Sequence, residues 1–130
     1  MFDRLSSYQP QALAALRMMS ALLFIEHGTQ KFFNFPPAEQ PFSDLMNIIG
    51  IAGVLEVVGG ILLLIGLFTR PVAFVLCGFM AVAYFMAHAP QGPFPITNGG
   101  EAAALYCFAF LYMAAAGGGT WSIDAARHRA

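Results

Sequence analysis

The sequence predicts an all-α integral membrane protein, a compact bundle of four transmembrane helices with both termini in the cytoplasm. Three observations lead to this prediction: the composition, the lengths of the apolar blocks, and the distribution of Lys and Arg. Hydrophobic residues make up 58% of the 130 residues and charged residues only 10%, whereas a soluble domain is nearer one-quarter charged. The length allows a single domain over residues 1–130. The net charge of −1 gives no indication of a nucleic-acid partner.

Four apolar blocks each have nearly the length that crosses a bilayer. A spanning helix needs about 17–25 residues, and helices are required because lipid offers no partner to an open backbone group. Segments rich in Pro and Gly separate the blocks, and residues 88–100, HAPQGPFPITNGG, are expected to form a loop. Ser43 is expected to be the N-cap of the second helix. The predicted spans are approximately residues 12–33, 45–67, 71–88 and 101–117.

Lysine and arginine are unevenly divided between the two predicted sides of the membrane. With the amino terminus inside, five arginines fall on the cytoplasmic side and Lys31 alone falls on the other. Cytoplasmic segments carry an excess of Lys and Arg, so this split favours both termini in the cytoplasm. The first block lacks a cleavage site of small residues, which indicates a retained span and not a signal peptide. The five arginines are Arg4, Arg17, Arg70, Arg127 and Arg129.

Ionisable side chains gather toward the predicted outer ends of the spans. The stretch IEHGTQKFF, residues 25–33, places an acid, an imidazole, an amide and an amine near the end of one apolar helix. Further polar residues end the third span and begin the fourth on the same side. The candidate ligand-binding or proton-transfer residues are Glu26, His27, Gln30, Lys31, Glu56, His88, Asn98 and Glu101.

Purely structural roles are open alternatives for several of these residues. Lys31 could extend its amine to the membrane interface, and His88 could end its helix as a C-cap before Pro90. Asn98 and Glu101 have the spacing of a capping box at the start of the fourth span. The one-turn pairs His27–Lys31 and Glu26–Gln30 could simply reduce the cost of taking each other out of water.

Glu56 stands apart because it lies deep within the apolar stretch GIAGVLEVVGGILLLIG. A charged side chain at the centre of a bilayer costs about 2.5–3.5 kcal/mol on the insertion scale. Gly53, Glu56 and Gly60 fall on one helical face, which is expected to pack closely against another helix and carry Glu56 inside. Glu56 is therefore expected to be protonated or paired with Lys31 or a His. We expect one cavity, open to the outer side, to hold Glu26, His27, Glu56, His88 and Glu101.

The sequence was also searched for redox, catalytic and metal-binding motifs, and none of these gives a site that we assign. Cys77 and Cys107 lie inside predicted spans and are interpreted as small apolar side chains without a redox role. The sequence has no phosphate loop, serine nucleophile elbow or paired-cysteine metal motif, so no self-contained catalytic motif is predicted. No metal or haem is assigned. The weaker alternatives are an iron or zinc site from His27, His88, Glu26 and Glu56, and bis-histidine haem ligation by His27 and His88.

Several stretches of the chain resemble the DoxX family of small bacterial membrane proteins. The similarity covers nearly the whole chain, from about Leu13 to Ala125. It rests on EHGTQKFF, GVLEVVGGILLLIGLFTRPVA and HAPQGPFPITNGGEAAALYCFAFLYMAAAGGGTWSIDA, in this order. The resemblance implies a four-helix protein of the bacterial inner membrane. Its matching positions are Glu26, His27, Gly28, Gln30, Lys31, Glu56, Gly59, Gly60, His88, Asn98, Gly99, Gly100 and Glu101.

Two functions follow from these observations. Members of the DoxX family have been linked to quinone-coupled sulfur oxidation and to thiol and oxidative-stress complexes, so the first is a membrane subunit of a redox-linked complex. Such a subunit would bind a quinone in a polar pocket near the outer face, with electrons delivered by a partner protein. The alternative is a non-enzymatic accessory or assembly subunit of a larger membrane complex, or a small carrier.

Overall fold

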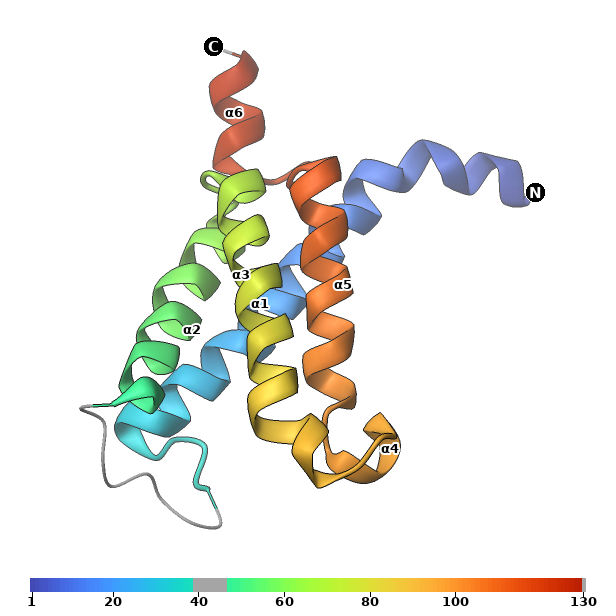
Figure 1. Ribbon diagram of the computed structural model, residues 1–130. Helices are drawn as coiled ribbons and strands as arrows, with labels where there is room; N and C mark the ends of the chain where they lie inside the picture. The colour runs from blue at the N-terminus through green and yellow to red at the C-terminus, as the bar shows by residue number, and fades with distance from the viewer. Residues whose placement is uncertain (39–46, 130) are drawn as a thin grey trace. The chain divides into compact units, whose positions relative to one another are not determined.

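The computed structural model describes residues 1–38 and 47–129, and these residues form helices with no strand among them (Figure 1). The prediction of an all-α protein is therefore confirmed for the described part of the chain. Contacts divide the chain into two compact units. Unit 1 is Met1–Phe68 with Gly118–Ala130, and unit 2 is Thr69–Gly117. Each unit is described by itself.

The amino-terminal half of unit 1 is built from a short 3₁₀ helix and two long α-helices. The 3₁₀ helix η1, Phe2–Tyr8, leads directly into α1, Gln9–Phe33, which has a proline in its first turn. A proline is favourable there because its missing N–H has no partner within the helix. Helix α1 ends at Asn34, which adopts the left-handed conformation and donates its N–H to the carbonyl of Gln30.

Helix α2, Ile48–Ile65, starts and stops at residues suited to those positions. The side-chain oxygen of Asn47 accepts a hydrogen bond from the N–H of Ile49 at 2.9 Å, which makes Asn47 the N-cap. The helix ends at Gly66, whose φ of +70° suits a residue without a Cβ. Residues 45 and 46 of the predicted second span, and the predicted cap Ser43, lie outside the described residues.

Helices α1 and α2 pack together along a seam of glycines, as the sequence predicted for one face of α2. A Cβ added to Gly28 would approach Cγ2 of Val57 to 2.5 Å, and one added to Gly60 would approach Cγ1 of Ile25 to 2.5 Å. A Cβ on Gly53 would meet the Phe32 ring at 2.7 Å. Small residues let two backbones approach closely, which is how helices associate where lipid removes the hydrophobic driving force.

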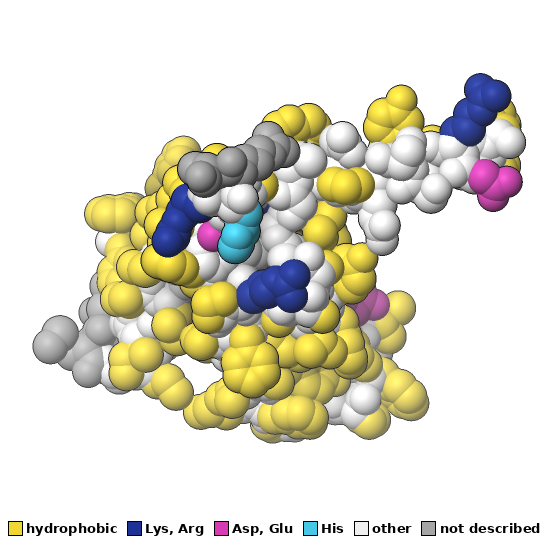
Figure 2. All heavy atoms as spheres, turned by 90° about the horizontal axis from the view of Figure 1, so that it is seen from above, with side chains coloured by type: hydrophobic (Ala, Val, Ile, Leu, Met, Phe, Trp, Pro, Cys, Tyr) yellow, Lys and Arg dark blue, Asp and Glu magenta, His cyan; other side chains and the backbone are white. Residues whose placement is uncertain are grey.

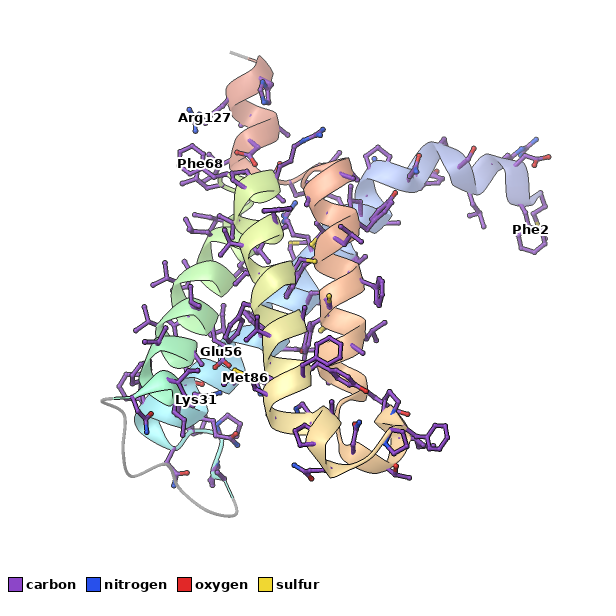
Figure 3. All side chains as sticks on the ribbon, viewed as in Figure 1. Phe2, Lys31, Glu56, Phe68, Met86 and Arg127 are labelled. Carbon is purple, nitrogen blue, oxygen red and sulfur yellow. The ribbon has the colours of Figure 1, made fainter. Side chains whose placement is uncertain are left out.

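The carboxy-terminal segment of unit 1 folds back onto the end of α2 and forms α6, Ile123–Arg129, a helix that the sequence analysis did not predict. The N–H of Asp124 donates to the carbonyl of Gly66, and its carboxylate accepts the N–H of Phe68, both at 2.9 Å. The guanidinium of Arg127 lies 5.3 Å from the centre of the Phe68 ring (Figure 3). These contacts join the end of α2 to the start of α6.

Unit 2 is an antiparallel pair of helices joined by a compact turn (Figure 1). Helix α3, Thr69–Ala83, continues into a π-helical turn, η2, Tyr84–His88. A 3₁₀ turn, η3, Ala89–Gln91, and a one-turn helix, α4, Pro95–Asn98, then lead to α5, Glu101–Ala116. Residues 88–100, predicted to be a loop, do connect the two helices, but the connection contains two short helical turns, because Pro90 and Pro95 each lie at the start of one.

Apolar side chains dominate the surface of the molecule. Figure 2 shows hydrophobic side chains over most of the visible face, with few charged side chains among them. Two stretches in the described residues are long and apolar enough to cross a membrane, Ile48–Ile65 and Thr69–Gln91, and α5 is a shorter apolar helix. Helix α1 is long enough at 25 residues but also carries Arg17, Glu26 and Lys31. The count of four spans and the orientation of the termini stay predictions.

Candidate functional site

An ion pair between α1 and α2 is the central feature of the candidate site. The Lys31 ammonium lies 2.9 Å from each of the two carboxylate oxygens of Glu56, so the pair is held at two points (Figure 3). The side chains are only 15% and 6% exposed, respectively. The interpretation of Lys31 as a residue that reaches only the membrane interface is therefore wrong. Of the partners expected for Glu56, the structure has Lys31.

The local sequence explains why both charges are held in this position. Glu56 lies at the middle of α2, and Gly53 and Gly60 on the same face bring that face against α1. Lys31 lies in the last turn of α1, where a positive charge is favoured by the helix dipole. Glu56 lies eight residues beyond Ile48, or about 12 Å along the axis at 1.5 Å per residue. The lysine thus reaches from the helix end to a carboxylate in the apolar middle of α2.

The other polar residues of α1 lie within one or two turns of Lys31 along the helix and have different surroundings. Glu26 and His27 are exposed in the described chain, and His27 lies one turn before Lys31 on α1. Gln30 donates its side-chain amide to the carbonyl of Pro36 at 3.2 Å. Gln30 therefore ties the segment after α1 back onto the helix.

A second group of polar residues lies in unit 2, where Asn98 joins three parts of the turn. Its amide nitrogen donates to the Tyr84 hydroxyl at 3.2 Å and to the Gly92 carbonyl at 3.0 Å. Its side-chain oxygen accepts the N–H of Gly100 at 2.8 Å. Helix α5 has no side-chain cap, and Glu101 is exposed in its first turn, so the predicted capping box of Asn98 with Glu101 is wrong.

His88 ends the π-helical turn with its ring in a defined hydrogen bond. Its Nδ1 lies 3.2 Å from the backbone oxygen of Asn98. A carbonyl oxygen only accepts, so Nδ1 must carry the proton, and in the neutral ring Nε2 then carries the lone pair. The backbone continues from His88 into η3, so the interpretation of His88 as a C-cap is wrong.

The five residues expected to share one cavity are divided between the two units. Glu26, His27 and Glu56 lie in unit 1, whereas His88 and Glu101 lie in unit 2. The expectation of one shared cavity therefore stays a prediction. Within residues 1–38 and 47–129, no group of three His, Cys, Asp or Glu side chains is placed to hold a metal ion.

Arg17 is a buried residue whose role the sequence analysis missed. The distribution of Lys and Arg places it among the arginines of the cytoplasmic side, but its side chain is fully buried in unit 1. Its guanidinium donates to the carbonyls of Gly118, of Thr120 at 3.3 Å and of Trp121 at 2.9 Å. The sequence does contain an indication of this burial. Arg17 lies five residues inside the first apolar block, where an unpaired charge is costly and a partner is therefore expected.

A pocket of about 420 Å³ lies beside this carboxy-terminal segment, near the amino-terminal end of α1 and the carboxy-terminal end of α2. None of the predicted site residues lines it, and none of its lining residues is ionisable. They are Gln11, Ile65, Thr120, Trp121, Ser122, Ile123, Ala125 and Ala126.

The apolar helices with a buried ion pair define a small helical membrane protein, and comparison with known proteins identifies its family. The model of the DoxX family matches residues 12–89, and the chain belongs to the DoxX family. The matched region includes Lys31, Glu56 and His88 but ends before Asn98. As a member of a membrane-protein family, the chain has the lipid bilayer as its surroundings.

The chain is also similar to an uncharacterized protein of Haemophilus influenzae. The two are 46% identical over 127 residues, which cover 94% of this chain and 95% of that protein. No solved structure matches the chain.

Proposed function

We propose that this chain is the membrane subunit of a redox-linked complex of the bacterial inner membrane, and that it binds a quinone beside the Lys31–Glu56 ion pair. The single observation that carries the proposal is this largely buried pair, in which the Lys31 ammonium at the end of α1 contacts both carboxylate oxygens of Glu56 in the middle of the apolar helix α2. Ionisable residues within membrane spans are expensive and are commonly functional. The proposal includes four spans with both termini in the cytoplasm, which places the pair toward the outer face.

Stability alone gives a poor reason for the pair. Well-packed apolar residues of similar volume often serve as well as a buried ion pair, or better by about 1–4 kcal/mol. The close packing of α1 on α2 already has its own source in the glycine seam. Binding of a ligand that needs a charge or a proton at this depth would explain why the sequence has an ion pair here.

The donors around the pair suit a ligand with carbonyl oxygens. An ammonium group offers three hydrogen-bond donors and no acceptor. Glu56 holds the ammonium group of Lys31 in a fixed place. His27 adds an imidazole one turn away on α1, and imidazoles exchange protons near neutral pH. These residues would orient a quinone by its carbonyls and hold protons near them. A bound quinone would accept electrons that a partner protein delivers.

The test compares quinone binding with folding in purified protein. Glu56→Gln removes the charge but keeps the shape and an amide oxygen that can accept from Lys31, so the helix content measured by circular dichroism should stay close to that of the unchanged protein even where its free energy of unfolding falls. Its affinity for a quinone analogue should fall at least tenfold, which corresponds to about 1.4 kcal/mol. Asp3→Asn is the matched control, because it removes an exposed carboxylate outside α1 and α2 and should leave binding unchanged.

The alternative function, an accessory or assembly subunit, predicts a different order of effects. In that case Glu56→Gln keeps full function, while Gly53→Leu and Gly60→Leu prevent recovery of the larger complex by separating α1 from α2. Wild-type quinone binding and complex recovery in Glu56→Gln would overturn the ligand site. An optical spectrum and a metal analysis of the same samples would reveal a haem or a metal ion.

A further inference from the structure

The two cysteines of the chain meet within unit 2. The Sγ atoms of Cys77 in α3 and Cys107 in α5 lie 3.7 Å apart, and both thiols are free and partly buried. Both residues lie on the packed faces of their helices. Cys77 follows the buried Ala73 by one turn, and Cys107 follows the buried Ala103 by one turn. The thiols therefore face each other across the contact between α3 and α5.

The separation is close to what a disulfide requires. A disulfide has its sulfurs about 2.05 Å apart, so the two Sγ atoms need to approach by about 1.7 Å. Rotation of the two side chains about χ1 changes such a distance with little movement of the helices. We propose that Cys77 and Cys107 form a reversible disulfide that joins α3 to α5, made by an uncharged, lipid-soluble, two-electron hydrogen acceptor. The proposal is independent of the quinone site in unit 1.

The acceptor takes up the electrons and protons that the two thiols lose. Each thiol loses its hydrogen and an S–S bond forms between the two sulfurs. The acceptor takes up two electrons and two protons and becomes its dihydro form. Quinones and azo compounds are acceptors of this kind.

The position of the cysteines explains why the oxidant should be lipid-soluble. Cys77 lies eight residues after Thr69 in the apolar stretch Thr69–Gln91, or about 12 Å along the helix. The thiolate is the reacting form toward any of these oxidants, but a charged, water-soluble disulfide would also have to leave water for apolar surroundings, which is costly. A charged disulfide such as oxidised glutathione should therefore react slowly with this pair.

The consequence is a covalent link at the middle of unit 2. The chain has only two cysteines, so any disulfide within one molecule must join these two helices. The link closes a loop that contains the turn from Tyr84 to Gly100. It should raise the temperature at which unit 2 unfolds, because a closed loop restricts the unfolded chain.

The experiment uses the full chain in lipid nanodiscs with diamide, an uncharged azo compound, as the oxidant. After treatment, the protein is denatured and reacted with a maleimide that retards migration on a gel. Untreated protein should react at two thiols, oxidised protein at none, and protein reduced again with dithiothreitol at two. The intact mass of the monomer should fall by two hydrogen atoms. A benzoquinone that carries a substituent on every free ring carbon, so that thiols do not add to the ring, should give the same product, and oxidised glutathione should give it far more slowly.

A matched variant tests the geometry. Cys77→Ala with Gly78→Cys moves the thiol by one residue, to a position where an added Cβ has no heavy atom within 4 Å. This variant should keep both thiols reactive under the same diamide treatment. The proposal is overturned if the unchanged protein keeps two reactive thiols while the same protein, denatured first, is oxidised. It is also overturned if oxidation gives only covalent dimers, or if the moved cysteine links as readily as Cys77.

Discussion

Lys31 and Glu56 are held together across the contact of α1 and α2, with the ammonium 2.9 Å from each carboxylate oxygen. The two residues are 25 positions apart in the chain, and the glycine seam brings their helices close enough for the contact. The charge of each side chain is compensated by the other. The pair is therefore expected to respond to substitution as one unit.

Removing one charge of the pair should cost more than removing both. Lys31→Met leaves the buried Glu56 without its partner and should lower the free energy of unfolding by about 3–5 kcal/mol. Lys31→Met together with Glu56→Leu should recover most of that loss, because no buried charge remains. Unfolding of four proteins by sodium dodecyl sulfate in mixed micelles would measure the coupling: the unchanged protein, Lys31→Met, Glu56→Leu and the double variant. Effects of the two single variants that simply add up would contradict a tightly coupled pair.

The glycine seam should tolerate no added methyl group. Gly28→Ala places a Cβ 2.5 Å from Cγ2 of Val57 and 3.0 Å from the carbonyl oxygen of Gly53. Since a carbonyl of the facing helix cannot move aside cheaply, overpacking should cost about 1–3 kcal/mol. Gly78→Ala is the control, as its Cβ meets nothing within 4 Å. Alanine favours a helix by about 1 kcal/mol over glycine, so this control should be neutral or stabilising in thermal unfolding.

Arg17 should hold the carboxy-terminal segment of unit 1 in place. Arg17→Met keeps a long, unbranched side chain like the apolar stem of arginine, but it leaves the carbonyls of Gly118, Thr120 and Trp121 without the guanidinium donor. An unsatisfied buried polar group costs about 1–3 kcal/mol. Amide hydrogens in residues 118–124 should then exchange faster with deuterium, as measured by mass spectrometry.

Arg70→Met provides the comparison for that experiment. Arg70 also donates to a carbonyl, that of Ala115 at 2.8 Å, but it is exposed and belongs to unit 2. Its loss should leave exchange in residues 118–124 unchanged. Equal protection in the Arg17 variant and the unchanged protein would contradict the role of Arg17.

The sequence predicted what depends on patterns along the chain and missed what depends on distant partners. The spacing of Gly53, Glu56 and Gly60 was enough to place Glu56 on the packed face of α2, because helical periodicity alone decides that face. The spacing of Asn98 and Glu101 was misleading. The Asn98 amide instead binds Tyr84, which is 14 residues away, and the local spacing contains no trace of that contact.

Arg17 illustrates the same limit for charges. The prediction of orientation counts every Lys and Arg as a group that flanks the membrane in water. The excess of these residues on the cytoplasmic side is a property of the whole set and says nothing of where any one side chain lies. The carbonyls that bind Arg17 lie 101 to 104 positions further along the chain. Their approach depends on how the carboxy-terminal segment folds back, which no local pattern specifies.

The orientation of the chain gives the last prediction. Arg4, Arg70, Arg127 and Arg129 fall near one predicted membrane face together with the buried Arg17, and Lys31 falls toward the other. Alkaline phosphatase, which folds only outside the cytoplasm, should be inactive when fused after Ala130 and active when fused after Ala38. Arg127→Gln with Arg129→Gln should not reverse this result, since the split remains three to one and the first span usually dominates orientation. Alkaline phosphatase activity after Ala130 would show that the carboxy terminus lies outside. The Lys31–Glu56 pair would then have to be assigned to the inner half of the membrane if the amino terminus proved to be outside as well.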